Sequence, residues 1–222
     1  MSTNAISVKP LSLHPVRVHV DPALDDRNRL TTAFRLILAI PHLLLVGGPI
    51  AALTWTSRPD GDGHWSWGAG GALGAVAGVC ALIAWFAIVF TGSSPEGLAR
   101  LERFYLRWRV RAAAYVALLR DEYPPFGDEP YPADVDLPVV PEPRNRLSVA
   151  FRPLLVIPQL IAVWVVGIAW WLATIVAWFA ILFTGRYPHA LYELGLGAFR
   201  WTTRVEAYLL LLTDEYPPFS LD

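Results

Sequence analysis

The chain contains few charges and almost no cysteine. Of its 222 residues, 17% are charged and 55% are hydrophobic, whereas a typical soluble domain has about 25% charged and about 45–50% apolar residues. The single cysteine, Cys80, excludes an intramolecular disulfide and a thiol–metal cluster. The formal net charge of −1 provides no basic face for nucleic acid. The composition is therefore that of a membrane protein with no nucleic-acid partner.

Several functional signatures are also missing. The first 26 residues have no apolar segment of the kind found in signal peptides, so we expect a polar tail at 1–13 and no cleavage. The histidines lack the spacing of metal ligands, and no Ser-His-Asp or Cys-His arrangement can be assembled. We therefore predict no catalytic residue, no cofactor and no metal site.

What the chain does have is an internal duplication. Arg-Asn-Arg-Leu, Trp-Phe-Ala-Ile and Asp-Glu-Tyr-Pro-Pro-Phe each occur twice, at 27–30 and 144–147, 85–88 and 178–181, and 121–126 and 214–219. The first pair is offset by 117 residues and the other two by 93. Because a duplication defines the structural unit, we predict repeat one at 14–126 and repeat two at 127–222.

Each repeat opens with alternating apolar and polar residues, at ~16–20 and ~133–137. This pattern predicts a half-buried β-strand in each repeat. The polar positions carry Arg17 in one strand and Asp134 and Asp136 in the other, so we hypothesise that the two strands pair. Opposite charges across a strand pair are worth roughly 0.2–1 kcal/mol. The alternative is two solvated strands that never meet.

Two apolar segments follow in repeat one, at ~30–53 and ~69–91. The first, as a helix of 24 residues, would extend ~36 Å, enough to cross a hydrocarbon core of ~30 Å. The residues between them, 54–68, have the composition of a loop. We therefore predict a transmembrane helical hairpin.

Repeat two lacks most of that loop, and its apolar segment runs without interruption from 147 to 184. A straight helix of ~57 Å is too long for one crossing. We therefore predict a hairpin that turns near Val166-Gly167, with spans at ~147–165 and ~168–184; a re-entrant hairpin is the alternative. Arg58 is the only one of the 18 Lys and Arg residues in a predicted hairpin loop, which favours four crossings with both termini cytoplasmic.

Each repeat closes with an amphipathic segment, at ~96–120 and ~189–212. In repeat one, arginines fill one face of the helix and aromatic residues another, the pattern of a helix lying in the membrane interface. The candidate contacts to lipid headgroups are Arg100, Arg103, Arg107 and Arg111. The alternative is a helix that packs against the cytoplasmic end of the hairpin and binds no particular lipid. The two interpretations are compatible.

Two arginines, Arg35 and Arg152, lie about one turn into apolar helices. A charge at the centre of a bilayer costs at least ~2.5–3.5 kcal/mol, so these side chains need partners or must reach the interface. The repeated acidic pairs lie on the same expected side. We predict a structural clamp that joins the arginines to these acids, rather than a substrate or proton site; its acidic candidates are Asp121, Glu122, Asp214 and Glu215.

Proline recurs in the first apolar helix of both repeats, whereas a glycine pattern occurs in repeat one. Pro41 and Pro158 interrupt the first apolar helix of each repeat and predict a kink, with a functional hinge as the alternative. Gly70, Gly74 and Gly78 are spaced by four in repeat one, which predicts close helix packing.

Three segments carry a family resemblance. Phe-Arg-Leu-Ile-Leu-Ala-Ile-Pro-His at 34–42, Trp-Phe-Ala-Ile-Leu-Phe-Thr-Gly-Arg-Tyr-Pro at 178–188 and Leu-Leu-Thr-Asp-Glu-Tyr-Pro-Pro-Phe at 211–219 resemble the bacterial membrane-protein family catalogued as domain of unknown function 4389. The resemblance covers nearly the whole chain as a tandem pair. It departs from the pattern at 91–95, where repeat one lacks the Arg-Tyr of repeat two. The resemblance implies an architecture and no activity.

The expected fold is mainly α and integral to the cell membrane. It has two tandem repeats, each with a strand, a transmembrane hairpin and an interfacial helix, related by a pseudo-twofold axis along the membrane normal. The expected function is that of a non-catalytic scaffold or accessory subunit that contacts the lipid bilayer and a membrane-protein partner or a second copy. The alternative is a small transporter or channel with a polar path at the repeat interface, and a lipid enzyme has the least support.

Overall fold

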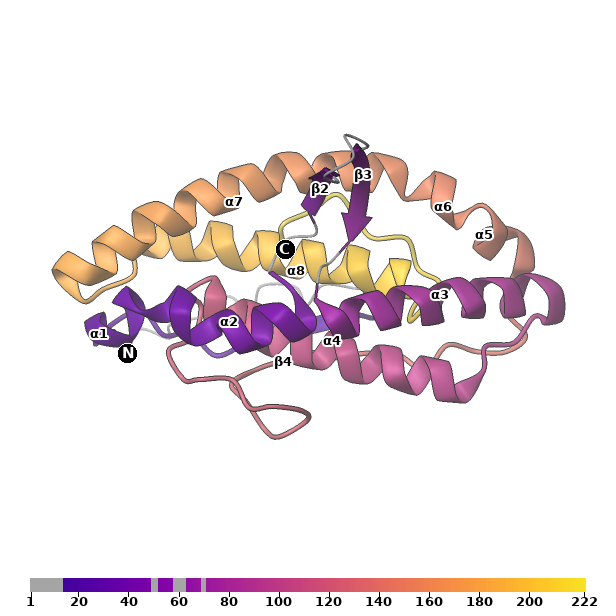
Figure 1. The fold of residues 1–222 in the computed structure, drawn as a ribbon, viewed down its shortest axis with the longest axis horizontal. Helices are drawn as coiled ribbons and strands as arrows, with labels where there is room; N and C mark the ends of the chain where they lie inside the picture. Colours follow the sequence, from indigo (N-terminus) through magenta and orange to yellow (C-terminus); the bar gives the residue numbers. More distant parts are fainter. Residues whose placement is uncertain (1–13, 49–51, 58–62, 69–70) are drawn as a thin grey trace, which may run out of the picture.

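The protein is mostly helical (Figure 1). The computed structural model describes residues 14–48, 52–57, 63–68 and 71–222. In chain order its elements are β1 Arg17–Val20, α1 Arg29–Ala33, α2 Arg35–Val46, β2 Ala52–Ser57, β3 Gly63–Gly68, α3 Ala72–Thr91, α4 Glu96–Val116, β4 Ala133–Asp136, α5 Arg146–Ala150, α6 Arg152–Leu155, α7 Ile157–Thr184 and α8 His189–Leu209.

Two long helical arms dominate the molecule. The first arm consists of α1, α2 and α3, and the second of α5, α6 and α7; in Figure 1 they run in opposite directions. The start of each arm meets the other arm, because α1 packs against α7 and α5 packs against α3. Helix α4 packs along the first arm and α8 along the second. The two repeats are therefore interlocked rather than side by side.

The repeated sequences mark the ends of the arms. The side chains of Asn28 and Asn145 accept hydrogen bonds from the first backbone N–H groups of α1 and α5, as N-cap residues do. At the other ends, Gly92 and Gly185 adopt left-handed conformations that terminate α3 and α7. The backbone N–H of Arg27 donates to the Gly185 carbonyl, and that of Arg144 donates to the Gly92 carbonyl. Each arm thus begins where the other one ends.

The predicted hairpin of repeat two is wrong. Helix α7 continues through Val166-Gly167 without a turn. Gly167 is buried, and a glycine in an apolar helix is tolerated where another element packs closely against it. The expectation of a turn rested on the assumption that the helix stands upright in a bilayer. Nothing in the backbone of this segment requires a turn.

The predicted hairpin of repeat one is also wrong. Helix α2 ends at Val46, seven residues before the predicted end of the first span, and Gly47 follows with φ +78°. Residues 52–57 and 63–68 form the antiparallel pair β2–β3, and α3 continues in the direction of α2 instead of folding back beside it (Figure 1). The sequence does contain a signal for this strand pair, because β-branched and aromatic residues at 53–56 and 64–67 flank the turn-forming Asp60-Gly61. Repeat two lacks the corresponding 24 residues, so its arm is nearly continuous.

The short strands join the two repeats. β1 pairs antiparallel with β4, with Arg17 opposite Asp136 and His19 opposite Asp134. The sheet contacts α4 through β4 and α8 through β1. Its buried valines, Val18 and Val135, and Val16 just before β1 belong to the same core as the inner faces of these helices.

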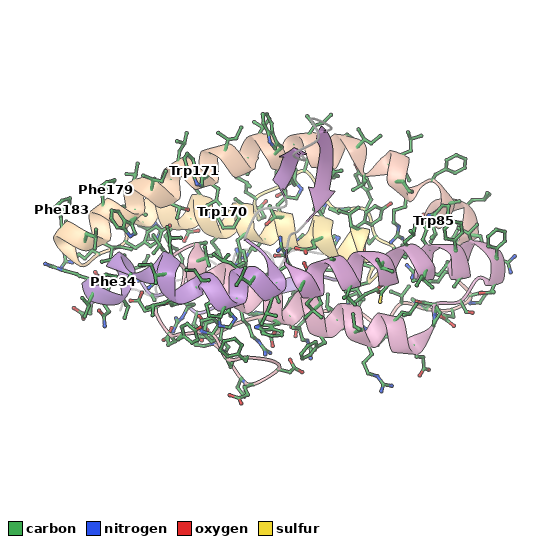
Figure 2. The ribbon with its side chains drawn as sticks, in the orientation of Figure 1. Phe34, Trp85, Trp170, Trp171, Phe179 and Phe183 are labelled. Carbon is green, nitrogen blue, oxygen red and sulfur yellow. The ribbon has the colours of Figure 1, made fainter. Side chains whose placement is uncertain are left out.

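Each arm buries one side and exposes apolar residues on the other. In α7, Trp170 points towards α8 and is buried, whereas Trp171 and Phe183 are 58% and 77% exposed (Figure 2). By length and composition, two helical segments could cross a membrane, Ala72–Thr91 and Arg152–Thr184.

Candidate functional site

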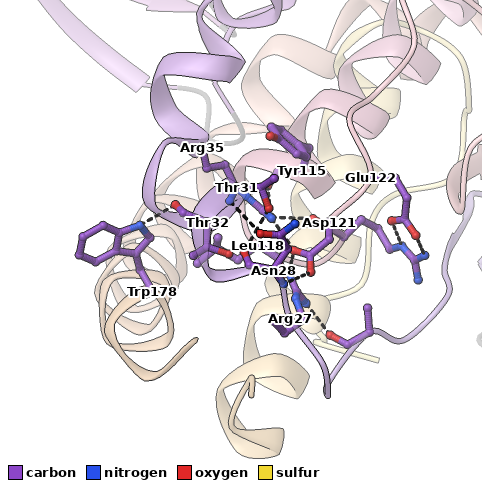
Figure 3. A network of polar contacts seen from close by, with 12 residues as sticks. Arg27, Asn28, Thr31, Thr32, Arg35, Tyr115, Leu118, Asp121, Glu122 and Trp178 are labelled. Carbon is purple, nitrogen blue, oxygen red and sulfur yellow. Dashed lines mark hydrogen bonds and ion pairs between the residues drawn. The ribbon is translucent and has the colours of Figure 1, made fainter. Parts of the chain in front are cut away.

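Arg35 lies at the start of α2 and is 1% exposed. Its Nη1 donates to the carbonyl oxygens of Tyr115, at 3.0 Å, and Arg120, at 2.6 Å, and its Nη2 forms an ion pair with Asp121 (Figure 3). The guanidinium carbon lies 4.5 Å from the centre of the Tyr115 ring, a cation–π distance. The structure therefore brings together the arginine and the first acid of the proposed clamp, and fixes the end of α4 to the first arm.

Asp121 also binds a second arginine. Arg27 Nη2 donates to Asp121 Oδ1 at 2.7 Å and to the carbonyl of Leu118 at 2.6 Å. The backbone N–H of Asn28 donates to Asp121 Oδ2 at 3.2 Å. Burial opposes ionisation of this carboxyl, but the guanidinium groups of Arg27 and Arg35 outweigh it and lower the pKa of Asp121.

Repeat two has a matching clamp. Arg152 donates to the carbonyls of Tyr208, at 2.9 Å, and Thr213, at 3.0 Å, and its Nη2 lies 2.6 Å from Asp214 Oδ1. Its guanidinium carbon lies 4.2 Å from the centre of the Tyr208 ring. Arg144 occupies the position of Arg27 and also pairs with Asp214. Burial again opposes ionisation, and the two arginines again lower the pKa of the Asp214 carboxyl.

The second acid of each repeated pair lies outside the clamp. Glu122 pairs with Arg120, and Glu215 is exposed. The tight turns that place the aspartates contain Leu118 and Leu211, with φ of +63° and +60°. Non-glycine residues rarely adopt this conformation, and both carbonyls accept a hydrogen bond from a clamp arginine.

The prolines lie at different points of their arms. Pro41 is inside α2, which continues through it, whereas Pro158 lies in the first turn of α7, just after the boundary with α6. The residues that follow them are buried and serve as acceptors for indole N–H groups of the amphipathic helices. Trp108 Nε1 donates to His42 Nδ1 at 3.1 Å, and Trp201 Nε1 donates to Gln159 Oε1 at 2.9 Å.

The four arginines proposed for headgroup contact differ in exposure. Arg100 is exposed, and Arg103 and Arg107 are partly exposed. Arg107 lies 3.7 Å from Asp128. The prediction is wrong for Arg111, which is buried and forms ion pairs with Asp128 at 3.1 Å and Asp134 at 3.2 Å. Its guanidinium therefore binds carboxylates within the protein instead of a lipid headgroup.

The strand and glycine residues have separate surroundings. Although Arg17 lies opposite Asp136, the carboxylate of Asp136 contacts His19 Nε2, at 2.9 Å. Gly74 packs against Tyr105, since a Cβ at this position would lie 3.0 Å from the tyrosine hydroxyl, whereas Gly78 faces open space. Gly70 lies outside the described residues.

The sequence analysis missed two buried residues, Arg109 and Glu102, and the partly buried Glu206. Arg109 Nε lies 2.6 Å from Glu206 Oε2, an ion pair that joins α4 to α8 and therefore one repeat to the other. Glu102 in α4 is 1% exposed, and its Oε1 has no hydrogen-bond partner in the part of the chain that the structure describes. Burial raises the pKa of Glu102 to about 8. None of the three recurs in the other repeat, where Thr202, Gly195 and Ala113 take the places of Arg109, Glu102 and Glu206, so the repeat pattern gave no signal for them.

The chemistry of these groups is structural. In each clamp two guanidinium groups share one carboxylate and also donate to backbone carbonyls. The described residues contain no cluster of histidine, cysteine or carboxylate side chains that could hold a metal ion. The geometry holds α4 and α8 against the arms and leaves the outer apolar faces of the arms uncovered.

The comparisons with known proteins give one result. Searches among curated proteins and among solved structures found no match. The family model described as Domain of unknown function (DUF4389) matches residues 66–127 and 146–220, one segment in each repeat. The first segment begins within β3 and the second at the start of α5, as expected if the β2–β3 insertion separates the start of the first arm from the rest of its repeat. Because the two segments cover more than half of the chain, the protein belongs to the DUF4389 family, as a tandem pair of its domains.

Proposed function

We propose that this protein is a non-catalytic scaffold or accessory protein of the cell membrane, which contacts lipid and a membrane-protein partner through the outer faces of its arms. One observation carries the proposal. From Pro153 to Gly185 the second arm contains no charged residue, and its exposed side chains include Trp164, Trp171 and Phe183. Extended apolar surfaces of this kind mark sites of membrane or protein interaction.

The first arm has the same property. Its exposed side chains include Phe34, Leu36, Leu82, Phe86 and Phe90. An apolar cavity of about 500 Å³ lies between α2 and α7, where the two arms face each other. Its walls are suited to the end of an acyl chain, because such pockets are lined mainly by apolar and aromatic side chains.

The packing of α4 decides how the arms meet the bilayer. Because α4 lies along α2 and α3, an upright arm would carry Arg100, Arg103 and Arg107 to the depth of the hydrocarbon core. Each such charge costs at least ~2.5–3.5 kcal/mol. If the arms instead lie flat, their apolar faces enter ~5–10 Å into one leaflet while the arginines stay in water. We therefore infer an in-plane orientation.

The in-plane orientation has further consequences for topology. The arginine-rich α4 and the β1–β4 sheet would face the cytoplasm, in line with the preference of Lys and Arg for that side. Two antiparallel arms in one plane are related by a twofold axis normal to that plane. The pseudo-twofold axis of the two repeats would therefore coincide with the membrane normal, although neither arm crosses the membrane.

Depth measurements along α7 test this orientation. Ile168→Cys, near the middle of α7, and Phe183→Cys, at its end, would be placed separately in a Cys80→Ala background and labelled with a fluorophore. The labelled proteins would be reconstituted into vesicles whose lipids carry a quencher at a known depth. Flat arms predict equal, shallow depths at both positions, because both face the same leaflet.

The matched control is Glu193→Cys in α8, whose label should stay accessible to an aqueous quencher. A label at position 168 that lies deeper than the label at 183 by a large part of a leaflet would show that α7 spans the membrane. Labels at both positions that respond only to the aqueous quencher would reject membrane binding altogether.

A further inference from the structure

A cavity of about 300 Å³ lies beside the first half of α4. Four of its lining residues come from α4, and others come from the segment that leads into α5 and from the turn that follows α8. Polar and charged side chains form one side, and Val139, Val140, Leu211 and Leu212 form the apolar side. The cavity shares Arg144 with the second clamp but lies outside the contacts that hold the clamp together.

The equivalent place in repeat two is filled by two tyrosines. With the offset of 93 residues, Ser94 and Ala99 in the cavity wall correspond to Tyr187 and Tyr192. Both tyrosines are buried, and their rings pack edge to face at 5.4 Å between centroids. Repeat one therefore has a cavity because small side chains replace two aromatic rings.

The wall opposite these positions is already arranged for an aromatic ring. The guanidinium carbon of Arg27, which comes from repeat one, lies 5.8 Å from the centre of the Tyr187 ring of repeat two. The equivalent arginine, Arg144 of repeat two, lines the cavity beside repeat one's α4. A ring in this cavity can therefore meet Arg144 as the Tyr187 ring meets Arg27. The hydroxyl groups of Tyr187 and Tyr192 have no hydrogen-bond partner among the described residues, so the rings account for their fit.

The charged groups around the cavity define the rest of the ligand. Arg100 and Arg103 line it, and neither forms an ion pair with any other described residue. The acids are Glu96 and Glu142, and Glu142 Oε1 accepts a hydrogen bond from the Ser94 backbone. The neighbouring Glu102 is protonated at neutral pH, because burial raises its pKa to about 8. With Arg144, three arginines therefore line the cavity against two glutamates, and the excess positive charge favours an anionic group.

We propose that the cavity binds a small aromatic carboxylate, with its ring in the space that the tyrosine pair fills in repeat two and its carboxylate facing Arg100 and Arg103. The apolar side of the cavity, formed by Val139, Val140 and two leucines, encloses the ring. This ligand class matches both the shape of the missing side chains and the sign of the uncompensated charge. The site is independent of the apolar faces of the arms and goes beyond the membrane function proposed above.

Phenylacetate is the probe that tests the proposal, since it combines one ring with one carboxylate. Isothermal titration of the full-length protein in a neutral detergent should show saturable binding of phenylacetate. Phenethylamine, which has the same ring and the opposite charge, should not bind. Arg103→Gln should weaken binding about tenfold, the loss expected for one charge-assisted hydrogen bond. Arg107→Gln, on the same helix but outside the cavity, should leave it unchanged.

A second variant tests the position of the ring. Ser94→Tyr with Ala99→Tyr recreates the tyrosine pair of repeat two and should abolish binding while the protein stays folded. If this double variant fails to fold, Ala99→Leu alone, which fills part of the same space, gives the same test. The proposal is overturned if phenylacetate shows no saturable binding in the millimolar range. It is equally overturned if binding is the same in the filled variants, or if Arg107→Gln weakens it as much as Arg103→Gln.

Discussion

Replacing Glu102 by glutamine should remove a pH dependence from the stability of the protein. The carboxyl group is buried in α4, and its pKa rises from an ordinary value of 4.5 to about 8 in the folded protein. Between these two values the unfolded chain has lost the proton and the folded chain keeps it. Stability is therefore lost as the pH rises through this window, and becomes constant above the folded pKa.

The size of the effect follows from the slope of this linkage. One proton changes the free energy of unfolding by about 1.4 kcal/mol per pH unit. Between pH 6.5 and pH 8, the wild-type protein should lose about 2 kcal/mol relative to the Glu102→Gln variant. For a chain of this length, that corresponds to a difference of about 4–8 °C in Tm.

The assay is thermal unfolding in a neutral detergent at several pH values from 6.5 to 8. Burial lowers the pKa values of His14 and His42, but the contribution of these histidines is the same in the wild type and the variant and cancels in the comparison. Glu193→Gln, at an exposed position in α8, is the matched control and should run parallel to the wild type. Parallel curves for Glu102→Gln and the wild type would refute the argument that Glu102 is buried and protonated.

Three further predictions concern the buried contacts. Asp214→Asn leaves two buried guanidinium groups without a carboxylate and should cost about 3–5 kcal/mol in denaturant unfolding, whereas Glu215→Gln should change stability by less than about 0.5 kcal/mol; equal effects would reject the clamp. Arg109→Met alone should cost a similar 3–5 kcal/mol, but its combination with Glu206→Leu should recover most of the loss, because a buried ion pair can be replaced by apolar residues. Trp201→Phe removes a hydrogen bond to a buried amide oxygen and should cost about 1–3 kcal/mol by the same assay, and no loss would mean that water replaces the indole.

Local features of the fold were accessible from the sequence. β1 and β4 fall within the predicted segments 16–20 and 133–137, and α4 begins at the predicted residue. These elements follow from short-range patterns, such as the alternation in the strands and the spacing of apolar residues in the amphipathic helices. The pairing of Arg35 with Asp121 was also within reach, because an arginine in an apolar helix needs a partner and both residues recur in the second repeat.

The direction of the two arms could not be predicted from short-range sequence patterns. A run of 38 apolar residues is compatible with a hairpin upright in a membrane and with one long helix lying flat, because hydrophobicity measures transfer from water and carries no direction. What separates the two is the packing of α4 and α8 along the arms, which is a tertiary feature. Glu102 and the Arg109–Glu206 pair escaped for another reason, since each depends on contacts between elements far apart in the chain.

The interlocking of the repeats means that neither repeat encloses a core by itself. β1 of repeat one pairs with β4 of repeat two, and the start of each arm packs on the other repeat. Trp178 Nε1 donates to the Thr32 carbonyl at 2.9 Å, and Trp85 Nε1 donates to the Val149 carbonyl at 2.8 Å. The α1–α7 and α3–α5 contacts therefore use equivalent hydrogen bonds. A single repeat would expose a strand edge and both of these surfaces. Each repeat of the sequence thus supplies half of one hydrophobic core. The repeats can differ elsewhere, as in the cavity beside α4, while these contacts between them maintain the fold.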